Sequence, residues 1–146
     1  MTKERLSELQ KKILLGMVKF YLIRKDYYSN PKNTRGMKMF TELDNHYYVS
    51  KLCRQSLKLK TRTQIQSVHR SLYNLSKKGY FGRNIIEFIQ STGFGLFFSE
   101  RAINMLNDIY YQKCGEKMFI KKKIKRKVEN YLLNKSVSIN SLNSLM

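Results

Sequence analysis

The sequence predicts a mainly α-helical protein with one small β-hairpin. Apolar residues recur at steps of three and four in several segments, which is helical spacing. Two β-prone runs, residues 80–89 and 94–98, flank a short turn and indicate the hairpin. Gly79 and Gly115 each follow a helical pattern directly. With 146 residues, of which 42% are apolar, the chain is long enough for one compact domain with a real core.

The first predicted helix covers residues 7–24. Ser7 and Gln10 form a capping-box pattern at its start. Its apolar positions are Leu6, Leu9, Ile13, Met17, Phe20 and Tyr21. Residues 25–38 contain the only proline, Pro31, among turn-forming and basic residues, and predict an exposed loop.

A short helix over residues 47–55 and a longer one over 63–78 come next. The longer helix has a narrow apolar stripe of Ile65, Val68, Leu72 and Leu75. Thr61 or Thr63 caps its start, and Gly79 ends it.

Beyond the hairpin, the pattern predicts two more helices and a tail. Ser99 caps a helix over residues 100–113. A final basic helix is expected over 117–134, because Ile120, Ile124, Val128 and Leu132 stand in steps of four. The expected organisation is a domain over 1–115, a basic C-terminal helix over 116–134 and a flexible tail, rich in Ser and Asn, over 135–146.

Charge is the strongest functional signal in the sequence. The formal net charge is +19 at pH 7, far above the magnitude of about 2 to 8 that keeps a small domain soluble. Such self-repulsion is most easily tolerated when a polyanion neutralises it. Nucleic acid is the first expected partner, and an anionic membrane surface is the second.

The sequence indicates neither an enzyme nor a metal site. Carboxylates are few and scattered, and no phosphate-cradling glycine loop occurs. Cys53 and Cys114 lie outside any CxxC pair, so we expect two buried free thiols and no cofactor. The sequence shows neither a signal peptide nor an apolar run long enough to span a membrane, and a cytoplasmic location is expected.

The order of elements resembles the winged helix-turn-helix family of DNA-binding proteins. Residues 6–14 are similar to the first helix of such domains, and residues 63–81, TQIQSVHRSLYNLSKKGYF, to a recognition helix that leads into a wing. Residues 95–101 are similar to the second wing strand and the start of a closing helix. Two departures are a longer loop after the first helix and a linker, residues 55–62, without the glycine often found in the turn.

The outward side of the helix over 63–78 has the residue types that a major groove accepts. At about 100° per residue, the side opposite the apolar stripe bears no acid. Arg suits guanine, and Gln or Asn suits adenine. We expect base reading by Thr63, Gln66, Ser67, Arg70 and Asn74, and phosphate contacts from Arg62, Tyr73, Lys77, Lys78 and Arg83. The uncharged wing tip, Gln90, Ser91 and Thr92, is expected to contribute little.

These features predict a sequence-specific binder of double-stranded DNA that acts as a transcriptional regulator. The apolar seam of the basic helix suits a homodimer, although the same helix could order only on a polyanion or a membrane surface. Two other functions stay open. One is binding of RNA or single strands through Tyr27, Tyr28, Tyr47 and Tyr48. The other is a non-enzymatic architectural or protein-interaction module.

Overall fold

A computed structural model of the chain describes residues 5–29, 32, 52–80, 98–123 and 129–146. Within these ranges the protein is mainly helical and has one small antiparallel hairpin, which confirms the predicted class at this coarse level. The elements in chain order are α1 (Glu8–Ser29), the π-helical turn η2 (Leu52–Ser56), α4 (Arg62–Lys77), α7 (Glu100–Cys114), β1 (Phe119–Lys123), β2 (Glu129–Leu133) and α8 (Ile139–Leu145).

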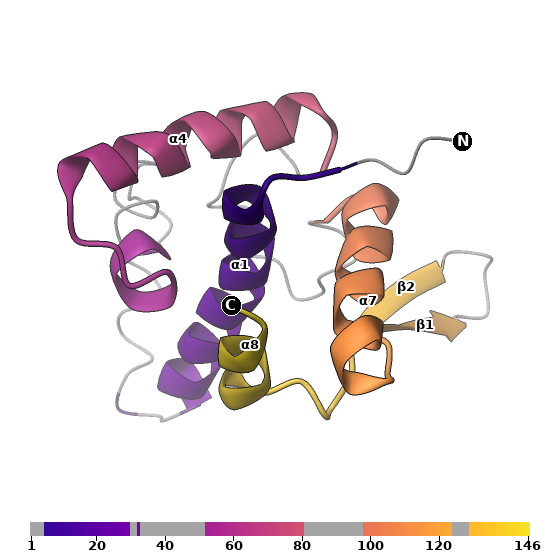
Figure 1. Ribbon diagram of the computed structural model, residues 1–146. Coiled ribbons are helices and arrows are strands. Elements are labelled where there is room, and N and C mark those ends of the chain that lie inside the picture. The colour runs from indigo at the N-terminus through magenta and orange to yellow at the C-terminus, as the bar shows by residue number, and fades with distance from the viewer. Residues whose placement is uncertain (1–4, 30–31, 33–51, 81–97, 124–128) are drawn as a thin grey trace.

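Helix α1 is the centre of the molecule. The predicted capping box is present at its start, where the Gln10 N–H donates to Ser7 Oγ and the Ser7 N–H donates to Gln10 Oε1, both at 3.1 Å. The middle of α1 is buried on every side, because α4 crosses one end of it and α7 and α8 lie alongside (Figure 1). Its core residues are Ile13, Leu14, Leu15, Met17, Val18 and Phe20.

Helix α4 follows the predicted pattern closely. Thr61 is the N-cap: its Oγ1 accepts from the Gln64 N–H while Gln64 Oε1 accepts from the Thr61 N–H, both at 3.3 Å. The chain leaves the helix through Gly79 at φ 82°, a left-handed conformation that favours glycine. The buried stripe consists of Val68, Leu72 and Leu75, and it packs on α1.

The end of α4 and the start of α7 are tied together. The Ser99 N–H donates to the Tyr80 carbonyl at 3.1 Å, and the Arg101 guanidinium donates to the Lys78 carbonyl and lies over the Tyr80 ring. Ser99 caps α7, as predicted, by accepting from the Ala102 N–H. The expected hairpin over 80–98 lies, apart from its two ends, outside the described residues.

The prediction of one helix over residues 117–134 is wrong. Strands β1 and β2 occupy the two ends of this range and pair antiparallel, with Phe119 opposite Leu133 and Ile120 opposite Leu132. The hairpin is fastened to α7 by Asn107, whose side chain bonds both the N–H and the carbonyl of buried Phe119, at 2.7 and 3.3 Å. A neighbouring helix therefore takes the place of a third strand at this residue.

The prediction of a flexible tail over 135–146 is also wrong. Ser138 caps α8 through a capping box with Ser141. Val137 and Leu142 are buried, and α8 packs against α1. The serines that suggested a fraying end instead satisfy the backbone of a short, docked helix.

Candidate nucleic-acid interface

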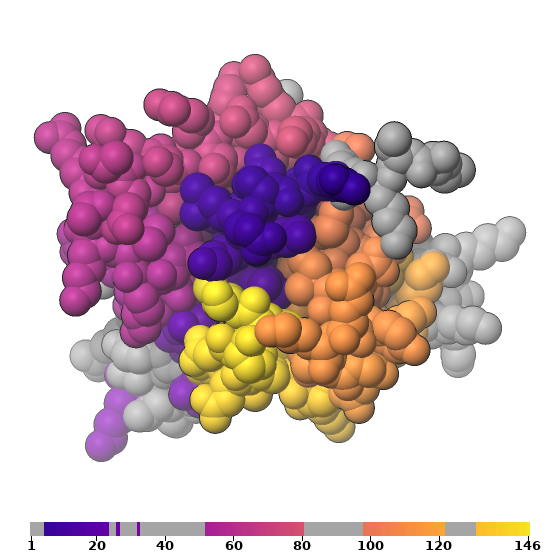
Figure 2. All heavy atoms as spheres, viewed as in Figure 1, coloured from indigo at the N-terminus to yellow at the C-terminus, as the bar shows by residue number. Residues whose placement is uncertain are grey.

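The outward side of α4 is a continuous polar surface, here called the reading face. It comprises Thr63, Gln66, Ser67, Arg70, Tyr73, Asn74 and Lys77, and every one of these residues is exposed. The α4 sequence contains no Asp or Glu. The structure thus brings together all five residues predicted to read bases, with two of those predicted to contact phosphates. In Figure 2, residues 52–80 form one block along one side of the molecule.

Three side chains of the reading face, Ser67, Tyr73 and Lys77, already have partners within it. Ser67 Oγ donates to the Thr63 carbonyl one turn earlier at 3.1 Å, so its hydroxyl proton is already used. It keeps its lone pairs and would accept from a base rather than donate. The Lys77 ammonium lies 4.6 Å from the centre of the Tyr73 ring, and Tyr73 is 61% exposed. This pair presents a cation and an aromatic ring together.

Cations flank both ends of the reading face. Arg62 lies at the start of α4, and Lys77 and Lys78 lie at its end, and all three are exposed. Three further cations near the start of α4 were not among the predicted site residues: Lys58 and Lys60, exposed in the turn before α4, and Arg54, exposed in η2. A signal for them was available, because no acid occurs between Asp44 and Glu87.

Buried Lys19 of α1 stabilises the segment that leads into α4. Lys19 is only 5% exposed, and its ammonium donates a hydrogen bond of 3.1 Å to the carbonyl of Ser56, which is the last residue of η2. Burial, and secondly the nearby Lys58 charge, lowers the pKa of Lys19. One turn earlier in α1, Gly16 leaves the space that Leu57 occupies: a Cβ there would lie 2.6 Å from Leu57 Cδ2. Helix α1 therefore holds the turn before α4 through both a hydrogen bond and a packing contact.

Several predicted site residues lie outside the described residues or on another element. Arg83 and the wing-tip residues Gln90, Ser91 and Thr92 lie outside the described residues, as do Ile124 and Val128 of the expected dimer seam. The other two seam residues, Ile120 and Leu132, face each other across the hairpin and are 50% and 51% exposed. Ile120 and Leu132 therefore belong to strands β1 and β2 and not to one helical seam, which was the basis for expecting a homodimer.

The thiols differ from the prediction in one respect. Cys53 and Cys114 are both free, but only Cys53 is buried, and Cys114 is exposed at the end of α7. In the part of the chain that the structure describes, no three His, Cys, Asp or Glu residues gather as a metal would require. Among the same residues, no helix is both long and apolar enough to cross a membrane.

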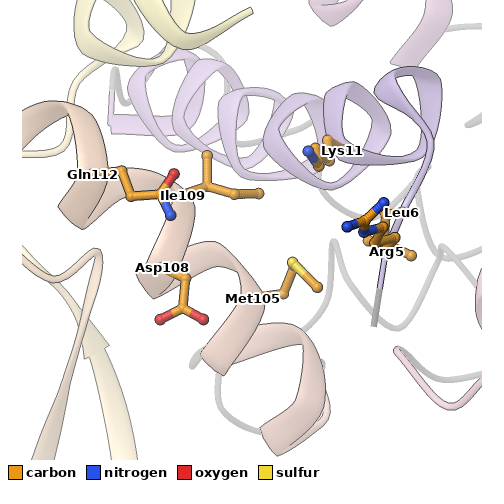
Figure 3. A pocket seen from close by; sticks show the side chains of 7 residues that line it. All are labelled: Arg5, Leu6, Lys11, Met105, Asp108, Ile109 and Gln112. Atoms are coloured by element: carbon orange, nitrogen blue, oxygen red, sulfur yellow. The ribbon is translucent and has the colours of Figure 1, made fainter. Parts of the chain in front are cut away.

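A pocket of about 430 Å³ lies away from the reading face, between the start of α1 and α7 (Figure 3). Its lining residues are Arg5, Leu6, Lys11, Met105, Asp108, Ile109 and Gln112. None of them belongs to α4 or to the turn before it. The pocket therefore takes no part in the candidate interface.

No protein-family model, curated protein or solved structure matches this chain.

Proposed function

We propose that this protein binds double-stranded DNA sequence-specifically through α4 and acts as a transcriptional regulator. The observation that carries the proposal is the reading face: an exposed, acid-free helix side that offers Arg, Gln and Asn and has cations at both ends. A solvated helix face commonly includes acids that pair with its own lysines and arginines. Their absence here favours an anionic partner.

The dimensions of α4 suit a major groove. Its 16 residues span about 24 Å at 1.5 Å per residue, and a groove about 12 Å wide admits a helix. Arg70, near the middle, is proposed to pair with guanine O6 and N7, and Gln66 and Asn74 with adenine N6 and N7. Ser67 is proposed to accept from a base amino group, since its proton is bonded to Thr63.

The flanking cations are proposed to set the register of α4 in the groove. Contacts to phosphates fix where a protein sits on the duplex but do not read sequence directly. We propose this role for Arg62 at the start of α4 and for Lys77 and Lys78 at its end, all of which are exposed. In the proposal Arg83 is a further phosphate contact, and the tip residues 90–92 keep their predicted minor role.

Selection of bound sequences from a random duplex pool tests the proposal, with solution mass measured alongside. We expect an enriched motif and an affinity that falls steeply with salt. A palindromic motif together with a doubled mass would indicate two copies on the site.

Competition with single-stranded DNA and RNA tests the main alternative. Duplex DNA should win this competition for the selected motif. A preference for single strands would instead indicate a protein that binds unpaired bases by stacking them on aromatic side chains, as the tyrosine pairs suggested. Absence of any nucleic-acid binding would favour a protein-interaction module.

A further inference from the structure

Lys58 adopts a backbone conformation that lysine disfavours. Its φ is 55°, and it is the one non-glycine residue with positive φ in the ranges that the structure describes. The Cβ of an L-residue is crowded in this conformation, whereas glycine adopts it freely. Lys58 stands in the linker whose missing glycine separates the sequence from the usual pattern of a helix-turn-helix turn.

The charge of Lys58 is unfavourable to the fold as well. Burial is the main cause of the lowered pKa of Lys19, and the nearby positive charge of Lys58 is the second. The Lys19 ammonium is held by the Ser56 carbonyl, two residues before Lys58. A glycine at position 58 would remove both the backbone crowding and this repulsion. The residue present is therefore not the one that stability alone would select.

Lys58 belongs to an exposed cationic turn, defined here as Lys58, Lys60 and Arg62. All three side chains are exposed, and no ion pair or hydrogen bond joins them to a side chain among the described residues. The turn leads directly into Thr61 and α4, so its charges lie beside the start of the reading face. Residues held in strained backbone conformations concentrate at functional sites.

We propose that Lys58 is a phosphate-contacting residue and that the cationic turn holds the DNA backbone beside the start of α4. This inference rests on the proposed function, and it adds a contact that the sequence pattern did not assign. The ligand is a backbone phosphate, so the contact strengthens binding to every duplex rather than to one sequence.

The test compares Lys58→Gly and Lys58→Gln with Lys12→Gln, which removes one exposed charge from α1 as a matched control. Thermal unfolding and duplex affinity are measured for each variant, the affinity at several salt concentrations with both the selected duplex and an unrelated one. We expect Lys58→Gly to unfold at the same or a higher temperature than the wild type. Both Lys58 variants should bind each duplex about fivefold more weakly at 0.15 M salt, and the salt slope should fall by about 0.9. Lys12→Gln should change neither quantity.

Two results would overturn the inference. One is a Lys58→Gly variant that binds DNA as Lys12→Gln does; the other is a lower unfolding temperature for Lys58→Gly, which would make Lys58 a structural residue. The proposed function fails separately. If Arg70→Ala keeps its preference for the selected motif while both Lys58 variants bind weakly, α4 does not read the sequence but the phosphate contact stands. If the wild type binds no duplex, both proposals are overturned.

Discussion

Burial separates the two cysteines of this protein. Cys53 lies in η2 with no exposed surface, and burial raises the pKa of its thiol to about 11. Because the folded state holds this proton more tightly than the unfolded chain, whose thiol has an ordinary pKa of 9.0, the stability of the fold should fall as pH rises from about 9 toward 11. Cys114, in contrast, is exposed at the end of α7.

This difference predicts selective labelling. A thiol reagent at pH 7.5 should modify Cys114 in the native protein and leave Cys53 unmodified, because the thiolate is the reactive form. Mass spectrometry should show one adduct natively and two in denaturant. Rapid native labelling of both thiols would contradict the burial of η2, and the Cys114→Ser variant should take up no label natively.

At the residue scale, the exposed positions of α4 could be predicted from the sequence, whereas the conformation of Lys58 and the burial of Lys19 could not. The outward positions of α4 could be predicted, because a regular helix fixes the direction of each side chain from its spacing. The conformation of Lys58 could not, since a lysine with positive φ has no sequence signature. The buried ammonium of Lys19 was equally hidden, because lysine normally indicates an exposed position.

At the scale of single elements, the cap at Thr61 anchors the start of α4. Thr61→Ala removes the acceptor of the Gln64 N–H and should lower the free energy of unfolding by about 1 kcal/mol, measured by urea titration. Thr63→Ala is the control, because it lies in the same turn but is not the cap. A Thr61→Ala variant as stable as Thr63→Ala would mean that the capping box contributes nothing.

The Asn107 side chain is the second element-level prediction. Asn107→Ala leaves the buried N–H and carbonyl of Phe119 without their partner and should cost about 1–3 kcal/mol. Amide exchange at Phe119 should accelerate at the same time. Asn104→Ala, at an exposed position on the same helix, should change neither quantity. Unchanged exchange at Phe119 in Asn107→Ala would show that the hairpin does not depend on this contact.

The hairpin also shows why periodicity misled at residues 117–134. Positions 120, 124, 128 and 132 recur in steps of four, which fits one side of a helix. Four is also a multiple of two, so the same positions share one face of a strand. The burial of neighbouring residues fits the strand and not the helix. Phe119 packs inward, with its ring 6.1 Å from that of Phe98, while Ile120 is exposed. The alternation of buried and exposed positions could not be seen in the sequence, because consecutive lysines give no change from apolar to polar along the strand.

At the scale of the whole molecule, positive charge is concentrated in two segments: residues 52–80 carry seven Lys or Arg and no acid, and residues 117–135 carry eight Lys or Arg and one Glu. The exposed cations of residues 52–80 are Arg54, Lys58, Lys60, Arg62, Arg70, Lys77 and Lys78. The total of +19 pointed to a polyanion but not to a location. Packing α4 on α1 turns the acid-free side of α4 outward, which is why we propose that side as the location. The C-terminal segments, predicted as a helix and a tail, instead form a hairpin that is bonded to α7 through Asn107 and a helix, α8, that packs on α1.

The most direct test of the reading face is base discrimination by Arg70→Ala. Sequences bound by this variant and by the wild type are selected from one random duplex pool, with Arg5→Ala as an exposed arginine control outside α4. We expect Arg70→Ala to lose about 1–3 kcal/mol of discrimination at one or two positions of the motif, about 5- to 150-fold, while Arg5→Ala keeps the wild-type motif. An unchanged motif in Arg70→Ala would contradict the assignment of α4 as the element that reads DNA.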